Sequence, residues 1–86
     1  MAVYVDDFRA PYGRMRMSHM TADTIDELHE MADAIKVHRK WFQGPPKTRT
    51  PHYDVCESKR RLAIIFGAIP ETSQQGVTRR KHAHGN

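Results

Sequence analysis

The 86-residue chain has a single cysteine, Cys56, and no long apolar segment. One cysteine excludes an internal disulfide and fits a reducing compartment, so we expect a cytoplasmic protein. No apolar run approaches the roughly 20 residues that cross a bilayer, and the opening residues M-A-V-Y-V-D-D lack the features of a secretory signal peptide. We therefore expect neither membrane insertion nor secretion.

Several widespread catalytic patterns are also missing from the sequence. It has no C-x-x-C or H-E-x-x-H zinc spacing, no G-x-x-x-x-G-K-[ST] phosphate loop and no G-x-S-x-G nucleophile turn. These absences prevent an assignment of function by motif. The sequence therefore leaves open whether the protein is an enzyme, and the positions of its polar residues are the remaining indication of function.

Charge is present but unevenly distributed. Five of the ten acidic residues lie between Asp23 and Asp33, whereas the segment 36–61 carries eight of the fourteen lysines and arginines. A basic segment attracts phosphate-bearing partners, although such runs are also common on solvated surfaces. A chain of this length buries only roughly 60% of its unfolded surface, so a bound ligand or a homo-oligomer would add stability.

Alternating side chains at the N-terminus predict a β-hairpin. Residues 2–6 form its first strand, A-P-Y-G signals the turn, and residues 14–20 form its second strand. In that second strand Met15, Met17 and His19 share one face, which we expect to point toward the core.

Two helices are predicted further along the chain. The first runs from Thr24 to Ile35, because apolar residues recur at helical spacing and Thr24 and Glu27 match a capping box. The second runs from about Val55 to Phe66, with Asp54 placed to cap it and Gly67 placed to end it.

The remaining segments complete a predicted α+β fold. Residues 37–43 are typical of a strand, residues 44–51 of a proline-rich loop, and residues 68–73 of a short edge strand. We expect a mixed sheet of three or four short strands with helices on one face, forming a single compact domain over residues 1–72. The polar and basic segment 73–86 is expected to be a mobile tail.

Short polar motifs recur along the chain in a recognisable order: Val5-Asp6, Gly13-Arg14, Ser18-His19-Met20, Ala22-Asp23, Glu27-Leu28-His29, Trp41-Phe42-Gln43, His52-Tyr53-Asp54 and Gly67-Ala68. Through these motifs the chain resembles a family of small bacterial and phage proteins catalogued as domain of unknown function 4031. The resemblance spans most of residues 2–72 and leaves the basic tail outside. It implies a bacterial cell or a phage-infected host, and it strengthens the choice of residues without implying a reaction.

A polar cluster is the main functional prediction. Asp6, His19, Asp23 and His52 can converge if the hairpin and both helix N-termini meet at one end of the sheet. Imidazoles beside carboxylates suit general acid–base chemistry or a divalent metal such as Zn²⁺ or Mn²⁺. We therefore predict four catalytic residues: His19, Asp23, His52 and Asp54.

Four further residues are predicted to bind a ligand: Asp6, Arg14, His29 and Tyr53. The stretch His52-Tyr53-Asp54 precedes the second predicted helix, and a helix N-terminus with a nearby imidazole and phenol suits an anionic group such as phosphate. The alternatives are structural. Capping can be the sole role of Asp54, and His19 can be a hydrogen-bonded core histidine.

Three function classes follow. The favoured one is a domain that binds or hydrolyses a phosphate-bearing small molecule such as a nucleotide. The second is a nucleic-acid binder that uses the basic 36–61 region and the tail, with Trp41 and Phe42 as stacking surfaces. The third is a phage-type interaction protein that blocks a host protein. The favoured class rests on the many acids and histidines among the family-like motifs.

Overall fold

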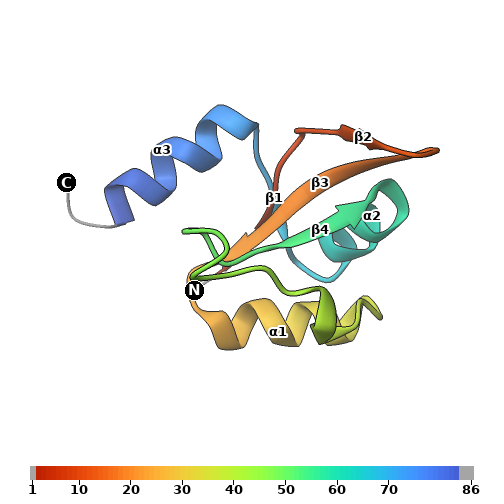
Figure 1. Ribbon diagram of the computed structural model, residues 1–86, viewed down its shortest axis with the longest axis horizontal. Helices are drawn as coiled ribbons and strands as arrows, with labels where there is room; N and C mark the ends of the chain where they lie inside the picture. The colour runs from red at the N-terminus through yellow and green to blue at the C-terminus, as the bar shows by residue number, and fades with distance from the viewer. Residues whose placement is uncertain (1, 84–86) are drawn as a thin grey trace.

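Strand β3 (Met15–Ala22) organises the sheet in the computed structural model, which describes residues 2–83. It pairs antiparallel with β1 (Val3–Val5), β2 (Ala10–Tyr12) and β4 (Tyr53–Cys56), while β5 (Ile69–Pro70) joins β1 in parallel. β4 lies along one edge of β3, and β1 and β2 lie along the other (Figure 1). The expected α+β class is confirmed, with a mixed sheet of five strands rather than three or four.

The core lies on one face of this sheet, under helices α1 (Ile25–Ala34) and α2 (Glu57–Ile65). Alternate strand residues supply it, because successive side chains point to opposite faces. Its buried hydrophobic members are Val3, Val5, Met20, Leu28, Ala32, Ile35, Tyr53, Val55, Ala63 and Ala68. The opposite face of the central strands is thereby left for polar side chains.

The predicted orientation of β3 is wrong. Ser18 and Met20 are buried on the core side, whereas His19 lies on the other face and Met15 is 46% exposed. The pairing explains this, because Met20 lies opposite both Val5 and Tyr53 and completes an apolar row across three strands. Because side chains alternate along a strand, an error of one residue in which position faces the core assigns every side chain of that strand to the wrong face.

Helix α1 begins as the sequence predicts. The Thr24 hydroxyl accepts a hydrogen bond from the backbone N–H of Glu27 at 3.2 Å and donates one to the Glu27 carboxylate at 2.8 Å. Leu28 and Ala32 are buried, whereas Ile25 is exposed although its spacing places it near the apolar stripe. The first turn therefore extends past the edge of the core.

The predicted strand over residues 37–43 is not formed. A 3₁₀ helix, η1 (Arg39–Trp41), occupies the segment, and the His38 imidazole caps it by accepting from the Lys40 N–H at 3.0 Å. Only Gln43 makes a β-bridge, with His52. Local side-chain to backbone hydrogen bonds of this kind compete with strand pairing.

Asp54 does not cap the second helix. It lies within β4, and α2 begins at Glu57 with Cys56 as its N-cap residue. The strand is favoured because Tyr53 and Val55 fill the core while the backbone pairs with β3. Gly67 follows the helix with a φ of 111°, as predicted for its C-terminal end.

A third helix, α3 (Ser73–Ala83), takes the place of the expected mobile tail. Arg79 attaches this helix to the sheet face opposite the core. Its guanidinium donates hydrogen bonds to both Glu71 carboxylate oxygens at 3.1 and 3.0 Å and to Thr21 Oγ1 at 2.8 Å. It also lies 3.5 Å from the centre of the Tyr4 ring. α3 thus lies across the sheet from α1 (Figure 1). The rest of the expected tail, residues 84–86, lies outside the described residues.

Within the described range 2–83, none of the helices combines the length and hydrophobicity that a bilayer crossing requires.

Candidate metal centre

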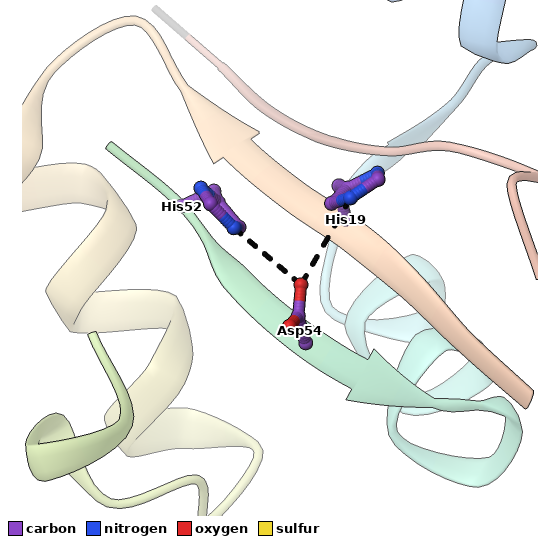
Figure 2. Close-up of side chains that lie close together, drawn as sticks. All are labelled: His19, His52 and Asp54. Atoms are coloured by element: carbon purple, nitrogen blue, oxygen red, sulfur yellow. Dashed lines mark ion pairs between the residues drawn. The ribbon is translucent and has the colours of Figure 1, made fainter. Parts of the chain in front are cut away.

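Three side chains converge on the polar face of the central strands. His19 comes from β3, and Asp54 lies opposite it on β4, two residues beyond His52. Residues two apart on a strand share a face, so both imidazoles reach the same carboxylate (Figure 2). Asp54 Oδ1 lies 3.5 Å from His52 Nε2 and 4.0 Å from His19 Nε2. One ligand atom from each residue lies within 4.8 Å of the others.

A buried carboxylate sets the orientation of His19. Asp6 Oδ2 lies 2.8 Å from His19 Nδ1, and Asp6 Oδ1 accepts backbone N–H bonds from Phe8 and His19 at 3.1 and 2.9 Å. Burial opposes ionisation of Asp6, but these hydrogen bonds outweigh it and hold its pKa below the ordinary value. The ionised carboxylate accepts a hydrogen bond from His19 Nδ1–H, so the neutral form of His19 has its lone pair on Nε2.

The hydrogen bond with Asp6 raises the pKa of His19, and burial opposes this increase. The charges of Asp6 and Asp54 also raise that pKa, whereas the positive charge of Arg80 lowers it. His19 is thus influenced by two carboxylates, of Asp6 and Asp54, and by an arginine of α3.

His52 and Asp54 are oriented in the same way by neighbouring groups. His52 Nδ1 lies 2.7 Å from the Thr50 carbonyl oxygen, which can only accept, so Nδ1 carries the proton and Nε2 presents a lone pair to the centre. The Gln43 amide donates to Asp54 Oδ2 at 2.9 Å and leaves Oδ1 facing the histidines. Each of the three groups is therefore held through one atom and open at another.

This arrangement matches the way proteins hold a divalent metal. Ligating histidines usually donate their second N–H to a carboxylate or a backbone carbonyl, as His19 and His52 do here. Metal–ligand bonds of about 2.0–2.2 Å place the donors of a tetrahedral site about 3.3–3.6 Å apart, so a metal would draw closer together ligand atoms that lie from 3.5 Å to within 4.8 Å of one another. Two imidazoles and one carboxylate suit Zn²⁺, Mn²⁺ or Fe²⁺ better than Ca²⁺, which prefers oxygen ligands.

Comparison with known proteins gives one family. A profile described as Protein of unknown function (DUF4031) matches residues 3–83. The chain belongs to this family. The match includes α3, which the resemblance in the sequence had left outside. No curated protein and no solved structure matches the DUF4031 chain.

The fold of this DUF4031 chain brings together four of the predicted site residues: Asp6, His19, His52 and Asp54. Asp23 is elsewhere, beyond the end of β3, where its Oδ1 accepts from the Tyr4 hydroxyl at 3.1 Å. Arg14 lies in the exposed turn between β2 and β3. Neither belongs to the converging cluster.

His29 and Tyr53 lie on the core side of the sheet, away from the three converging groups. The Tyr53 ring is fully buried, and its hydroxyl makes a 2.7 Å hydrogen bond with His29 Nδ1. Burial raises the pKa of Tyr53. Phe42 packs edge-on against both rings. The hydrogen bond to part-buried His29 thus satisfies the Tyr53 hydroxyl at the border of the core.

Sequence reasoning missed two partners of the centre, Gln43 and the Thr50 carbonyl. The W-F-Q motif contains Gln43, but its role depends on the bridge between Gln43 and His52, which joins the loop ends. It also missed α3, which brings Arg80 toward His19. No local pattern in the sequence could indicate these contacts.

Proposed function

We propose that the DUF4031 domain binds one divalent transition-metal ion through His19, His52 and Asp54, and uses it to bind and hydrolyse a phosphate-bearing ligand. The observation that carries the proposal is the orientation of all three donor groups toward one point by Asp6, the Thr50 carbonyl and Gln43. A centre with three protein ligands keeps positions open for water and substrate, as catalytic metal sites do.

The exposure of the three groups supports a reactive rather than a purely structural site. The side chains of His19 and Asp54 are 38% and 41% exposed, whereas that of His52 is 13% exposed. His52 is thus the most buried of the three groups, and solvent or a ligand can approach from the side of His19 and Asp54.

The charges near the centre support phosphate as the bound group. A cavity of about 430 Å³ beside the Thr50 end of the site is lined in part by Arg49 and Arg80. A second cavity includes Asp54 itself and four lysines: Lys36, Lys40, Lys47 and Lys59. Cationic side chains therefore lie on two sides of the centre, where they can pair with the negative charge of a phosphate ester.

The chemistry is a displacement at phosphorus. A divalent ion held by His19, His52 and Asp54 would polarise a phosphoryl oxygen and lower the pKa of a water molecule. The water oxygen forms a bond to phosphorus while the bond from phosphorus to the leaving oxygen breaks, and a proton from that water ends on the leaving alcohol.

Metal content is the first test. Untagged protein exposed to Zn²⁺, Mn²⁺ or Fe²⁺ and then dialysed should retain about one ion per chain. His52→Ala and Asp54→Ala should lose that ion, because each removes one of the three ligands. His38→Ala removes an exposed histidine of η1 and serves as the matched control, which should retain the metal.

Hydrolysis is tested on the same proteins with bis-p-nitrophenyl phosphate and a panel of nucleotides. Metal-loaded wild type should release product, and His52→Ala should not. Wild type that retains none of the three metals would overturn the metal centre. Stoichiometric metal without turnover of any phosphate ester would overturn the hydrolytic part of the proposal.

A further inference from the structure

A large cavity adjoins the metal centre on the side of β4 that leads toward α2. Its volume is about 970 Å³, and Asp54 forms part of its wall. A ligand that fills this cavity therefore reaches the carboxylate that we assign to the metal. The volume lies near the upper end of the roughly 300–1,000 Å³ that small-molecule sites occupy.

The cavity combines lysines with exposed aromatic rings. Lys40, Lys47 and Lys59 come from η1, the following loop and α2, so the fold gathers them from separate segments. Trp41 is 62% exposed and Tyr12 is 69% exposed, although both line the cavity. The Lys40 ammonium lies 5.2 Å from the centre of the Trp41 ring. Aromatic rings between cations are the surface on which unpaired bases stack.

A single-stranded nucleic acid fits this surface better than a single nucleotide does. The lysine cavity lies at one end of the metal centre, and the cavity with Arg49 and Arg80 lies at the other. A phosphodiester held at the metal would thus have cations on both sides along its backbone. Paired bases in a duplex are stacked on one another, so they cannot also stack on Trp41.

We infer that the phosphate-bearing ligand of the metal centre is a single-stranded nucleic acid whose bases stack on Trp41 and Tyr12 beside Asp54. The inference rests on the proposed function for the position of the scissile phosphate, and it adds the class of the substrate. Lys47 and Lys59 then contact the backbone phosphates, which makes the affinity fall steeply with salt.

Trp41 is the only tryptophan of the chain, so its fluorescence reports on this cavity alone. Metal-free full-length protein is titrated with an oligonucleotide of ten thymidines, which it cannot cleave. We expect a saturable quench of the Trp41 emission that weakens as salt rises. A thymidine mononucleotide and a ten-base-pair duplex should bind at least tenfold more weakly.

Variants assign the contacts, with binding followed by the anisotropy of a labelled oligonucleotide. Trp41→Phe should retain most of the affinity, and Trp41→Ala should lose roughly 5- to 100-fold, as expected for one stacked base. Lys59→Ala should weaken binding severalfold. Arg61→Ala removes one positive charge from the exposed face of the same helix and should change binding less than twofold.

The outcomes separate the two proposals because metal content is measured on every variant. Equal binding by Trp41→Ala and wild type, or a duplex bound as tightly as the single strand, would overturn the nucleic-acid inference even where the metal is retained. If the mononucleotide binds as tightly as the oligonucleotide, the inference of a single-stranded nucleic acid is wrong and the ligand is a free nucleotide. Loss of the metal centre itself would appear as wild type without bound ion.

Discussion

At the scale of single residues, the two aspartates of the centre show that surroundings decide what a carboxylate does. Asp6 is 4% exposed and accepts three hydrogen bonds, which leaves it no room for a ligand. Asp54 is partly exposed and has one oxygen held by Gln43 and one directed at the histidines. Asp6 therefore positions His19, and Asp54 is the group that can bind a metal.

This difference predicts the effect of Asp6→Asn. The asparagine keeps the size and the acceptor for the backbone N–H groups, but its NH₂ group faces His19 Nδ1. The histidine would then have to accept at Nδ1 and carry its proton on Nε2, where a metal cannot bind. We expect zinc affinity to fall about 10- to 100-fold by isothermal titration calorimetry. Asp26→Asn, in the exposed first turn of α1, is the control and should bind zinc like wild type.

Asp6→Asn also distinguishes orientation from folding. The thermal melting temperature of the metal-free variant is measured in parallel, since a folded variant with weakened zinc binding supports the positioning role. Unchanged zinc affinity in a folded Asp6→Asn protein would contradict it.

At the scale of elements, the parts that the sequence predicts well are those governed by local rules. α1 combines a capping threonine with apolar residues at helical spacing, and Gly67 ends α2 through a backbone conformation that glycine adopts readily. These features need little information from distant parts of the chain. The convergence of Asp6, His19 and His52 is not among them: the sequence predicts it from a meeting of the hairpin with two helix N-termini, whereas it arises from the pairing of β3 with β4 and from the hydrogen bond between Asp6 and His19.

The elements that the sequence does not predict depend on distant contacts. Y-D-V-C is too short for periodicity to identify, and an aspartate before a basic helical segment resembles an N-cap. Its strand conformation comes from pairing with β3, more than thirty residues earlier, and from the buried Tyr53 and Val55. Long-range pairing also explains why Asp23 lies outside the cluster. Its predicted place in the cluster required the start of the first helix to lie beside the other site residues.

Helix α3 is the clearest case of a long-range cause. It has no apolar stripe that would predict packing, and Arg79 holds it through Tyr4, Thr21 and Glu71. The side chain of Glu71 is only 8% exposed in this ion pair. The attachment is therefore polar but well shielded from solvent.

We predict that Arg79→Ala destabilises the fold. The substitution leaves the shielded Glu71 carboxylate without its partner, and an unsatisfied buried acceptor costs about 1–3 kcal/mol. Urea unfolding followed by circular dichroism measures the change. Lys81→Ala, on an exposed position of the same helix, should stay within about 0.5 kcal/mol of wild type. Equal stability of the two variants would show that Arg79 does not anchor α3.

At the scale of the whole molecule, the sheet separates stability from chemistry. One face carries α1, α2 and the buried core, and α3 lies on the other side of the sheet (Figure 1). The candidate centre lies on that second face. The three proposed ligands lie on the face opposite that core, and the side chains of His19 and Asp54 are 38% and 41% exposed. Substitutions at the centre should therefore alter ligand binding more than folding, which makes them informative.

The small size of the domain predicts a strong link between metal and stability. A chain of 86 residues buries a limited core, so binding energy at the centre is a large fraction of the total. A metal that binds only the folded state at 100 times its dissociation constant adds about 2.7 kcal/mol. For a domain of this size, each kcal/mol raises the melting temperature by about 4–8 °C.

Zinc should therefore raise the melting temperature of wild type by about 10–20 °C over protein treated with EDTA, as measured by differential scanning calorimetry. The ion joins β3 to β4 and stabilises the pairing on which the site depends. Asp54→Asn keeps a group that the Gln43 amide can still contact but removes a charged ligand, so its melting temperature with EDTA should match that of wild type while its response to zinc is largely lost. An equal zinc response in both proteins would place the metal elsewhere on the chain.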